Sequence, residues 1–146
     1  MAFKFKMQKV LDYRSQLEEE AKVGLANALA KHKACQDQLD KLTAALMEAE
    51  AKSAEIMQPG ERWLLDQYLK GLHADHKMLA LQERMLAQMA EEARQHLASC
   101  AIDRKVLEKL KERHKAHHYR TEQKQELNFN DEIATIRHKA PALEAN

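Results

Sequence analysis

The sequence predicts an all-α fold: a long antiparallel two-helix coiled-coil hairpin in which the second helix overhangs the first. The 146 residues include only 3 Gly, 2 Pro and 5% aromatic residues, too little turn and bulky-core material for a compact sandwich or α/β domain. Apolar residues recur at steps of three and four along most of the chain. One strong helix breaker, Gln58-Pro59-Gly60, separates two such stretches. We therefore expect one coiled-coil domain over residues 1–146.

The first helix is expected over about residues 6–57. His32 and Ser53 are the polar interruptions of its seam, whose apolar or small members are Val10, Leu17, Ala21, Gly24, Ala28, Cys35, Leu39, Leu42, Leu46, Ala49 and Ile56. Such spacing is typical of the buried seam of a coiled coil. Two consecutive four-residue steps, from Gly24 through Ala28 to His32, predict a local unwinding of the supercoil.

A hairpin turn at 58–61 should lead into a second helix over about residues 62–138. Its expected seam consists of Trp63, Leu65, Leu69, Leu72, Leu79, Leu86, Ala90, Ala93, Leu97, Cys100, Leu107 and Leu110. Pro141 is expected to end the helix and leave a frayed tail at 139–146, because proline disrupts helical hydrogen bonding. Folding about Pro59 places residue 6 near residue 112, so the rest of the second helix overhangs. Cys35 and Cys100 would lie roughly 24 Å apart along the helices, beyond the reach of a disulfide.

The composition and motifs argue against an enzyme. Charged residues make up 32% of the chain but nearly balance, at a net charge of +1, so overall charge does not mark a nucleic-acid or membrane binder. The sequence has no phosphate-binding glycine loop, no nucleophile elbow and no cysteines at metal-binding spacing. A two-helix hairpin also offers no enclosed pocket. We expect no catalytic residues, no cofactor and no bound metal. No apolar run reaches the roughly 18 residues of a membrane span, which predicts a cytoplasmic protein.

A basic segment rich in histidine occupies the second helix near the open end of the hairpin. His114 and His118 lie four residues apart and His117 lies between them, a spacing that can hold half of a metal site. The hairpin brings this segment beside Lys4, Lys6, Lys9 and Arg14. The alternatives are a solubilising charged face, a surface for an acidic protein, a metal site and a nucleic-acid site. Few stacking aromatics and interleaved glutamates disfavour nucleic acid.

The turn end is expected to be apolar. Trp63, Tyr68, Leu69 and Leu72 follow the turn, and a two-helix seam cannot bury all of Trp63, Leu64 and Leu65. Either Trp63 folds over the turn and stabilises it, or this end is a hot spot for a partner protein.

Both ends of the chain resemble a known family. Residues 3–14, FKFKMQKVLDYR, and the following 18–21, EEEA, resemble the opening of the flagellar export protein FliJ family. Residues 106–113, VLEKLKER, and 130–134, NDEIA, are similar to its closing pattern. The segment from Cys100 to Leu107 and the histidines match no family pattern, so no role is expected for them from the resemblance.

The resemblance implies a non-catalytic stalk of the flagellar type III export apparatus, similar to the central stalk of rotary ATPases. It implies a cytoplasmic protein, monomeric alone and peripheral at the inner face of the cell membrane at the flagellar base. The implied partners are the hexameric export ATPase FliI and the export gate membrane protein FlhA, with export chaperones as further partners. The expected ATPase-binding residues at the open end are Phe3, Phe5, Met7, Lys9, Arg14, Lys109 and Arg113. The expected gate-binding residues near the turn are Leu42, Leu46, Trp63, Tyr68, Leu69 and Leu72.

One alternative needs no export partner. Leu127, Phe129, Ile133 and Ile136 form a partial seam on the overhanging part of the second helix, through which a structural coiled-coil protein would self-associate.

Overall fold

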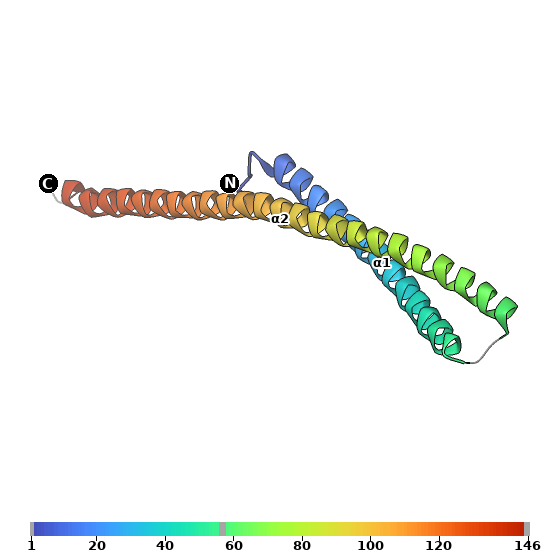
Figure 1. The fold of residues 1–146 in the computed structure, drawn as a ribbon. Helices are drawn as coiled ribbons and strands as arrows, with labels where there is room; N and C mark the ends of the chain where they lie inside the picture. Colours follow the sequence, from blue (N-terminus) through green and yellow to red (C-terminus); the bar gives the residue numbers. More distant parts are fainter. Residues whose placement is uncertain (1, 56–57, 145–146) are drawn as a thin grey trace. The chain divides into compact units, whose positions relative to one another are not determined.

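The protein consists of two α-helices, α1 (Gln8–Ser53) and α2 (Pro59–Glu144), shown in Figure 1. This computed structural model describes residues 2–55 and 58–144, and the side chains of 2–55 and 58–138. No strand occurs among these residues. The two helices pack against each other through contacts described below, so the predicted all-α helical hairpin is confirmed.

The connection between the helices lies earlier in the sequence than expected. α1 ends at Ser53 rather than at 57, and the next two backbone N–H groups, of Ala54 and Glu55, donate to carbonyls three residues back. Such bonds tighten the last turn of a helix and satisfy carbonyls that the α-helical pattern leaves open. The serine hydroxyl also donates to the Glu50 carbonyl at 2.6 Å. The expected seam residue Ile56 lies outside the described residues.

α2 begins at Pro59 rather than after a turn at 58–61. The first bond of the α-helical pattern runs from the Arg62 N–H to the Gln58 carbonyl at 3.0 Å. Proline suits the first helical position, because its missing N–H has no partner there and its φ is already helical. The residue that marked the break in the sequence therefore starts the second helix. The Arg62 side chain also donates to the Ser53 carbonyl at 3.3 Å, joining the two helix ends.

The C-terminal end of α2 also differs from the expectation. The helix continues through Pro141 to Glu144, so residues 139–144 of the expected frayed tail are helical. Proline removes one helical hydrogen bond, but its fixed φ lies in the helical range, so the backbone path can continue. Residues 145 and 146 lie outside the described residues.

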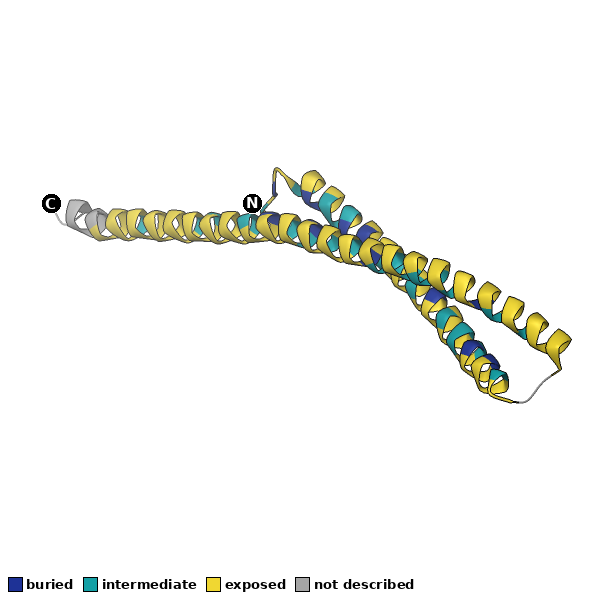
Figure 2. Cartoon of the chain, in the orientation of Figure 1, coloured by how far each residue is buried: buried dark blue, intermediate teal, exposed yellow. Residues whose placement is uncertain are grey.

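The chain divides into two compact units, and each contains parts of both helices. Unit 1 comprises residues 1–15 and 102–146, and unit 2 comprises residues 16–101. Unit 1 has a core of Phe5, Leu11 and Leu107, whereas unit 2 has a core of Leu46, Ala49 and Leu72 near the connection. Figure 2 shows that buried residues occur where helices face each other, as a two-helix packing requires. That the two units behave as one domain stays a prediction.

Most positions of the expected seam are buried or half-buried, and the exceptions are informative. Val10, Gly24 and Trp63 are exposed, while Leu11, next to Val10, is 6% exposed and belongs to the core of unit 1. A side chain one position along a helix points about 100° away, so the seam at the start of α1 runs through Leu11. Cys35 and Cys100 are buried and free.

Candidate partner-binding surfaces

The N-terminal stretch of unit 1 is held against α2 by its aromatic residues. Phe5 is 8% exposed in the core with Leu11 and Leu107, and Phe3 packs against the same core. Met7 is 39% exposed. Of the three apolar residues predicted to contact an ATPase, Phe5 is therefore buried in the core and Met7 is the most accessible.

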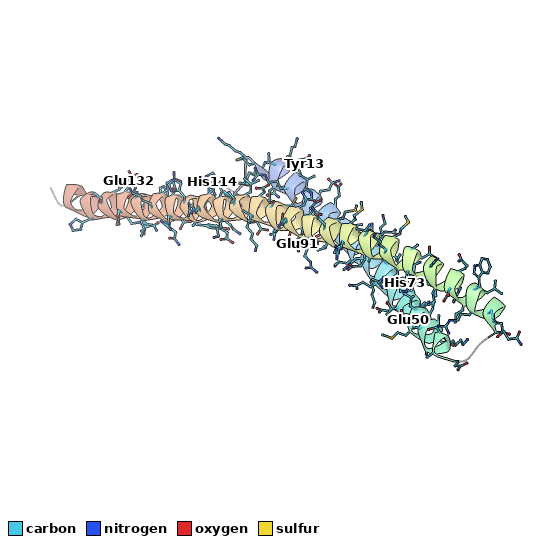
Figure 3. All side chains as sticks on the ribbon, in the orientation of Figure 1. Tyr13, Glu50, His73, Glu91, His114 and Glu132 are labelled. Carbon is cyan, nitrogen blue, oxygen red and sulfur yellow. The ribbon has the colours of Figure 1, made fainter. Side chains whose placement is uncertain are left out.

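Two of the histidines contact these phenylalanines. The ring centroids of Phe5 and His114 lie 5.8 Å apart, and those of Phe3 and His118 lie 5.6 Å apart. His118 also lies 6.0 Å from the ring of Tyr119 and 3.1 Å from Glu122. Figure 3 labels His114 on α2 where the N-terminal stretch runs beside the helix. The histidine spacing that suggested half of a metal site is therefore used for packing.

The predicted cations of unit 1 differ in their accessibility. Arg14 is half-buried, and its Nη1 donates to the Asp103 carbonyl of α2 at 2.9 Å. Lys9, Lys109 and Arg113 are exposed. The last two line a shallow groove whose other lining residues are Glu112, Ala116, His117 and Arg120. The unit therefore has a cationic, solvent-facing side on α2 and one structural arginine.

In unit 2, the four leucines predicted to bind a gate protein, which also belong to the expected seam, lie in the core or against it. Leu46 and Leu72 are buried together with Ala49, and Leu42, Leu69 and Leu65 pack against them. Burial between two helices explains this placement, because these leucines are large apolar side chains that hold the helix ends together. Trp63 and Tyr68 are 62% and 55% exposed. The accessible part of the predicted gate surface thus consists of two aromatic side chains.

An apolar groove farther along unit 2 was not predicted from the sequence. It is lined by Leu42, Met78, Leu81 and Met85, among others, and both methionines are more than half exposed. Methionine side chains are flexible and polarizable, which suits a surface that accommodates different partners. The spacing of the methionines along α2 would have been the signal, since Met78 and Met85 lie one heptad apart.

A polar pair in the seam of unit 2 was also missed. The His32 Nε2 and Glu83 Oε1 lie 2.7 Å apart, and the two side chains are 19% and 23% exposed. Glu83 lies four residues after Leu79 and three residues before Leu86, so helical spacing could have placed it in the seam.

Two kinds of feature are absent from the described residues. No three His, Cys, Asp or Glu side chains among them lie close enough to hold a metal ion. No helix in the searched part of the chain is long and apolar enough to cross a membrane.

Comparison with known proteins identifies the family. The family model described as Flagellar FliJ protein matches residues 3–142, which include most of both units. No curated protein and no solved structure matches the chain. Members of the matched family are non-enzymatic components of flagellar export. The chain belongs to the flagellar FliJ family.

Proposed function

We propose that the protein is a stalk that couples the export ATPase FliI to the export gate FlhA during flagellum assembly. The family match over residues 3–142 is the observation that carries this proposal. Two further features support it. Each unit has its own apolar core, and the two candidate surfaces differ, with exposed lysines on the N-terminal stretch in unit 1 and the exposed Trp63 and Tyr68 in unit 2. A coupling protein needs two such surfaces with different chemistry.

The ATPase-binding surface is proposed to lie in unit 1. Lys4, Lys6 and Lys9 are exposed around the aromatic residues that fix the N-terminal stretch on α2. Exposed cations at the edge of an interface mainly raise the association rate with an acidic partner and set the orientation of docking. Phe3 and Phe5 contribute indirectly, because they hold the stretch in place.

The gate-binding surface is proposed to lie in unit 2, on Trp63 and Tyr68. Aromatic residues dominate binding energies at protein interfaces because they bury a large area with few rotatable bonds. Leu42, Leu46, Leu69 and Leu72 support this surface from the core beneath it.

The ATPase assignment is tested by reversing three charges, in a Lys4→Glu, Lys6→Glu, Lys9→Glu variant. We expect the concentration needed for half-maximal stimulation of ATP hydrolysis by FliI to rise roughly ten- to a hundredfold, since juxtaposed like charges cost several kcal/mol. Arg14 is left unchanged because its side chain holds α1 against α2.

A matched control carries the same three reversals in unit 2, at the exposed Lys31, Lys33 and Lys41. It has the same net charge and should stimulate FliI as the wild type does. A folded N-terminal variant that stimulates FliI fully would contradict the assignment, and equal losses in both variants would show that only net charge matters.

One observation favours self-association as a second candidate function. Leu127, Phe129 and Ile136 are all more than 60% exposed on α2. If these residues pair with a second copy, light scattering will give a mass that rises with concentration to twice 16.9 kDa. The stalk proposal expects 16.9 kDa at every concentration.

A further inference from the structure

One face of α2 in unit 1 carries a row of five Lys and Arg side chains and one histidine. Six exposed residues follow one another at steps of three and four: Lys105, Lys109, Arg113, His117, Arg120 and Lys124. We call these six residues the cationic face. At about 100° per residue they fall within about 120° of the helix circumference, and at about 1.5 Å per residue they extend over roughly 30 Å.

Carboxylates are absent from this arc between residues 105 and 124. Glu108, Glu112 and Glu122 point outside it, and Glu112 comes nearest, at the edge of the groove that Lys109 and Arg113 line. Two of these acids have partners on other faces: Glu108 lies 2.7 Å from Arg104, and Glu122 lies 3.1 Å from His118. Within the described part of the chain, no residue of the cationic face takes part in an ion pair. Its charge is therefore available to an external anion.

Apolar side chains flank the cations on the same face. Ile102 and Val106 precede them and are 61% and 57% exposed, and Leu127 follows them at 63%. The row continues in both directions at helical spacing. Val106 lies four residues after Ile102 and three before Lys109, and Leu127 lies three residues after Lys124. A cluster of about four to eight Lys and Arg residues on a helix that also carries exposed apolar side chains is typical of binding to anionic lipid headgroups.

We infer that the cationic face of α2 binds the anionic phospholipid headgroups of a membrane surface. A flat, anionic surface contacts all six positions at once, because they spread over a third of the helix. Pairing with a second helix is disfavoured, since the central row positions, Arg113, His117 and Arg120, are polar where a coiled coil requires apolar residues. The face also has no aromatic residue on which nucleic-acid bases would stack. This binding does not depend on the proposed coupling function.

The test is co-sedimentation of the full chain with phosphatidylcholine vesicles that contain or lack phosphatidylglycerol. We expect binding only to the vesicles with phosphatidylglycerol, and a loss of binding as added salt shortens the screening length. A Lys105→Gln, Arg120→Gln, Lys124→Gln variant should bind on the order of a hundredfold more weakly, because each basic residue near an anionic surface contributes a factor of about five. Lys109 and Arg113 stay unchanged because they also belong to the predicted ATPase surface.

The control variant removes three exposed cations elsewhere, by Lys41→Gln, Lys115→Gln and Arg137→Gln. Lys115 and Arg137 lie on other faces of α2, so this variant should bind like the wild type while having the same net charge as the test variant. Circular dichroism checks that both variants keep their helix content. Equal binding of the two variants would overturn the inference, as would equal binding to neutral vesicles. Tighter binding to an oligonucleotide or to polyglutamate than to the anionic vesicles would also overturn it, by assigning the face to a different polyanion.

Discussion

A polar pair, His32 and Glu83, joins α1 to α2 at a place in unit 2 where the neighbouring Cys35 and Leu79 are apolar. Both side chains are less than a quarter exposed, so each loses most of its contact with water. Polar residues at single seam positions can fix the register of two helices at a cost in stability. We expect this pair to do so in unit 2, because a shifted register would leave both groups without partners.

The prediction concerns the His32→Leu and Glu83→Leu variants and their combination. Each single variant should lower the free energy of unfolding by about 1–2 kcal/mol, because it leaves a partly buried polar group unpaired. The double variant should be as stable as the wild type or more stable, since two leucines extend the apolar seam. Urea unfolding followed by circular dichroism measures all three.

A second histidine pair in the same unit provides the control. His73 and Glu50 lie 3.5 Å apart, and Figure 3 labels both on facing helices, but they are 59% and 56% exposed. An exposed pair contributes about 0–1 kcal/mol, so Glu50→Leu should have little effect. If Glu50→Leu and Glu83→Leu lower the free energy of unfolding equally, burial of the His32–Glu83 pair has no special role in stability.

At the scale of the helices, sequence periodicity was sufficient to predict two helices and most of the contacts between them. Leu46 and Leu72 meet as the expected antiparallel register requires. Proline marked the break between the helices correctly. Its position in the first turn of α2 was missed, because a helix-breaking residue is also a favourable helix-starting residue.

The contacts of the N-terminal stretch were harder to predict, because its backbone is not helical. Residues 2–5 have no regular secondary structure. Phe5 contacts His114, whereas Phe3, two residues earlier in the chain, contacts His118, four residues farther along α2. Two residues of extended chain rise about 6.6 Å and four helical residues about 6 Å, so this match follows once the stretch is extended. Helical periodicity cannot predict these contacts, because it describes only the spacing of residues within a helix.

Among the candidate site residues, charge was easier to predict than accessibility. The exposed lysines follow from sequence, because lysines rarely lie in a core, whereas Trp63, which was expected in the seam, is exposed. Leucines near the connection were assigned to a partner surface, although they are needed to hold the helices together there. Sequence spacing identified the packed seam, which includes these leucines, but it does not show how much of each seam side chain stays accessible to a partner.

For the molecule as a whole, the two units provide separate tests of separate functions. Each has its own buried core, and the proposed ATPase-binding and gate-binding surfaces do not share residues. Trp63 and Tyr68 are exposed in unit 2, so substitutions there remove contact area without opening a cavity. Binding to one partner should therefore be lost without loss of the other.

The last prediction is that a Trp63→Ala, Tyr68→Ala variant binds FlhA at least about tenfold more weakly, since truncating an aromatic hot-spot residue typically costs more than 1–2 kcal/mol. Its stimulation of FliI should match that of the wild type. Titration against the purified cytoplasmic part of FlhA and an ATPase assay measure the two effects on one preparation. A Met47→Ala, Met89→Ala variant, which also removes two exposed apolar side chains of unit 2, is the control and should bind FlhA normally. Parallel loss of both activities would indicate unfolding rather than a gate-binding surface, and unchanged FlhA binding would remove Trp63 and Tyr68 from the candidate site.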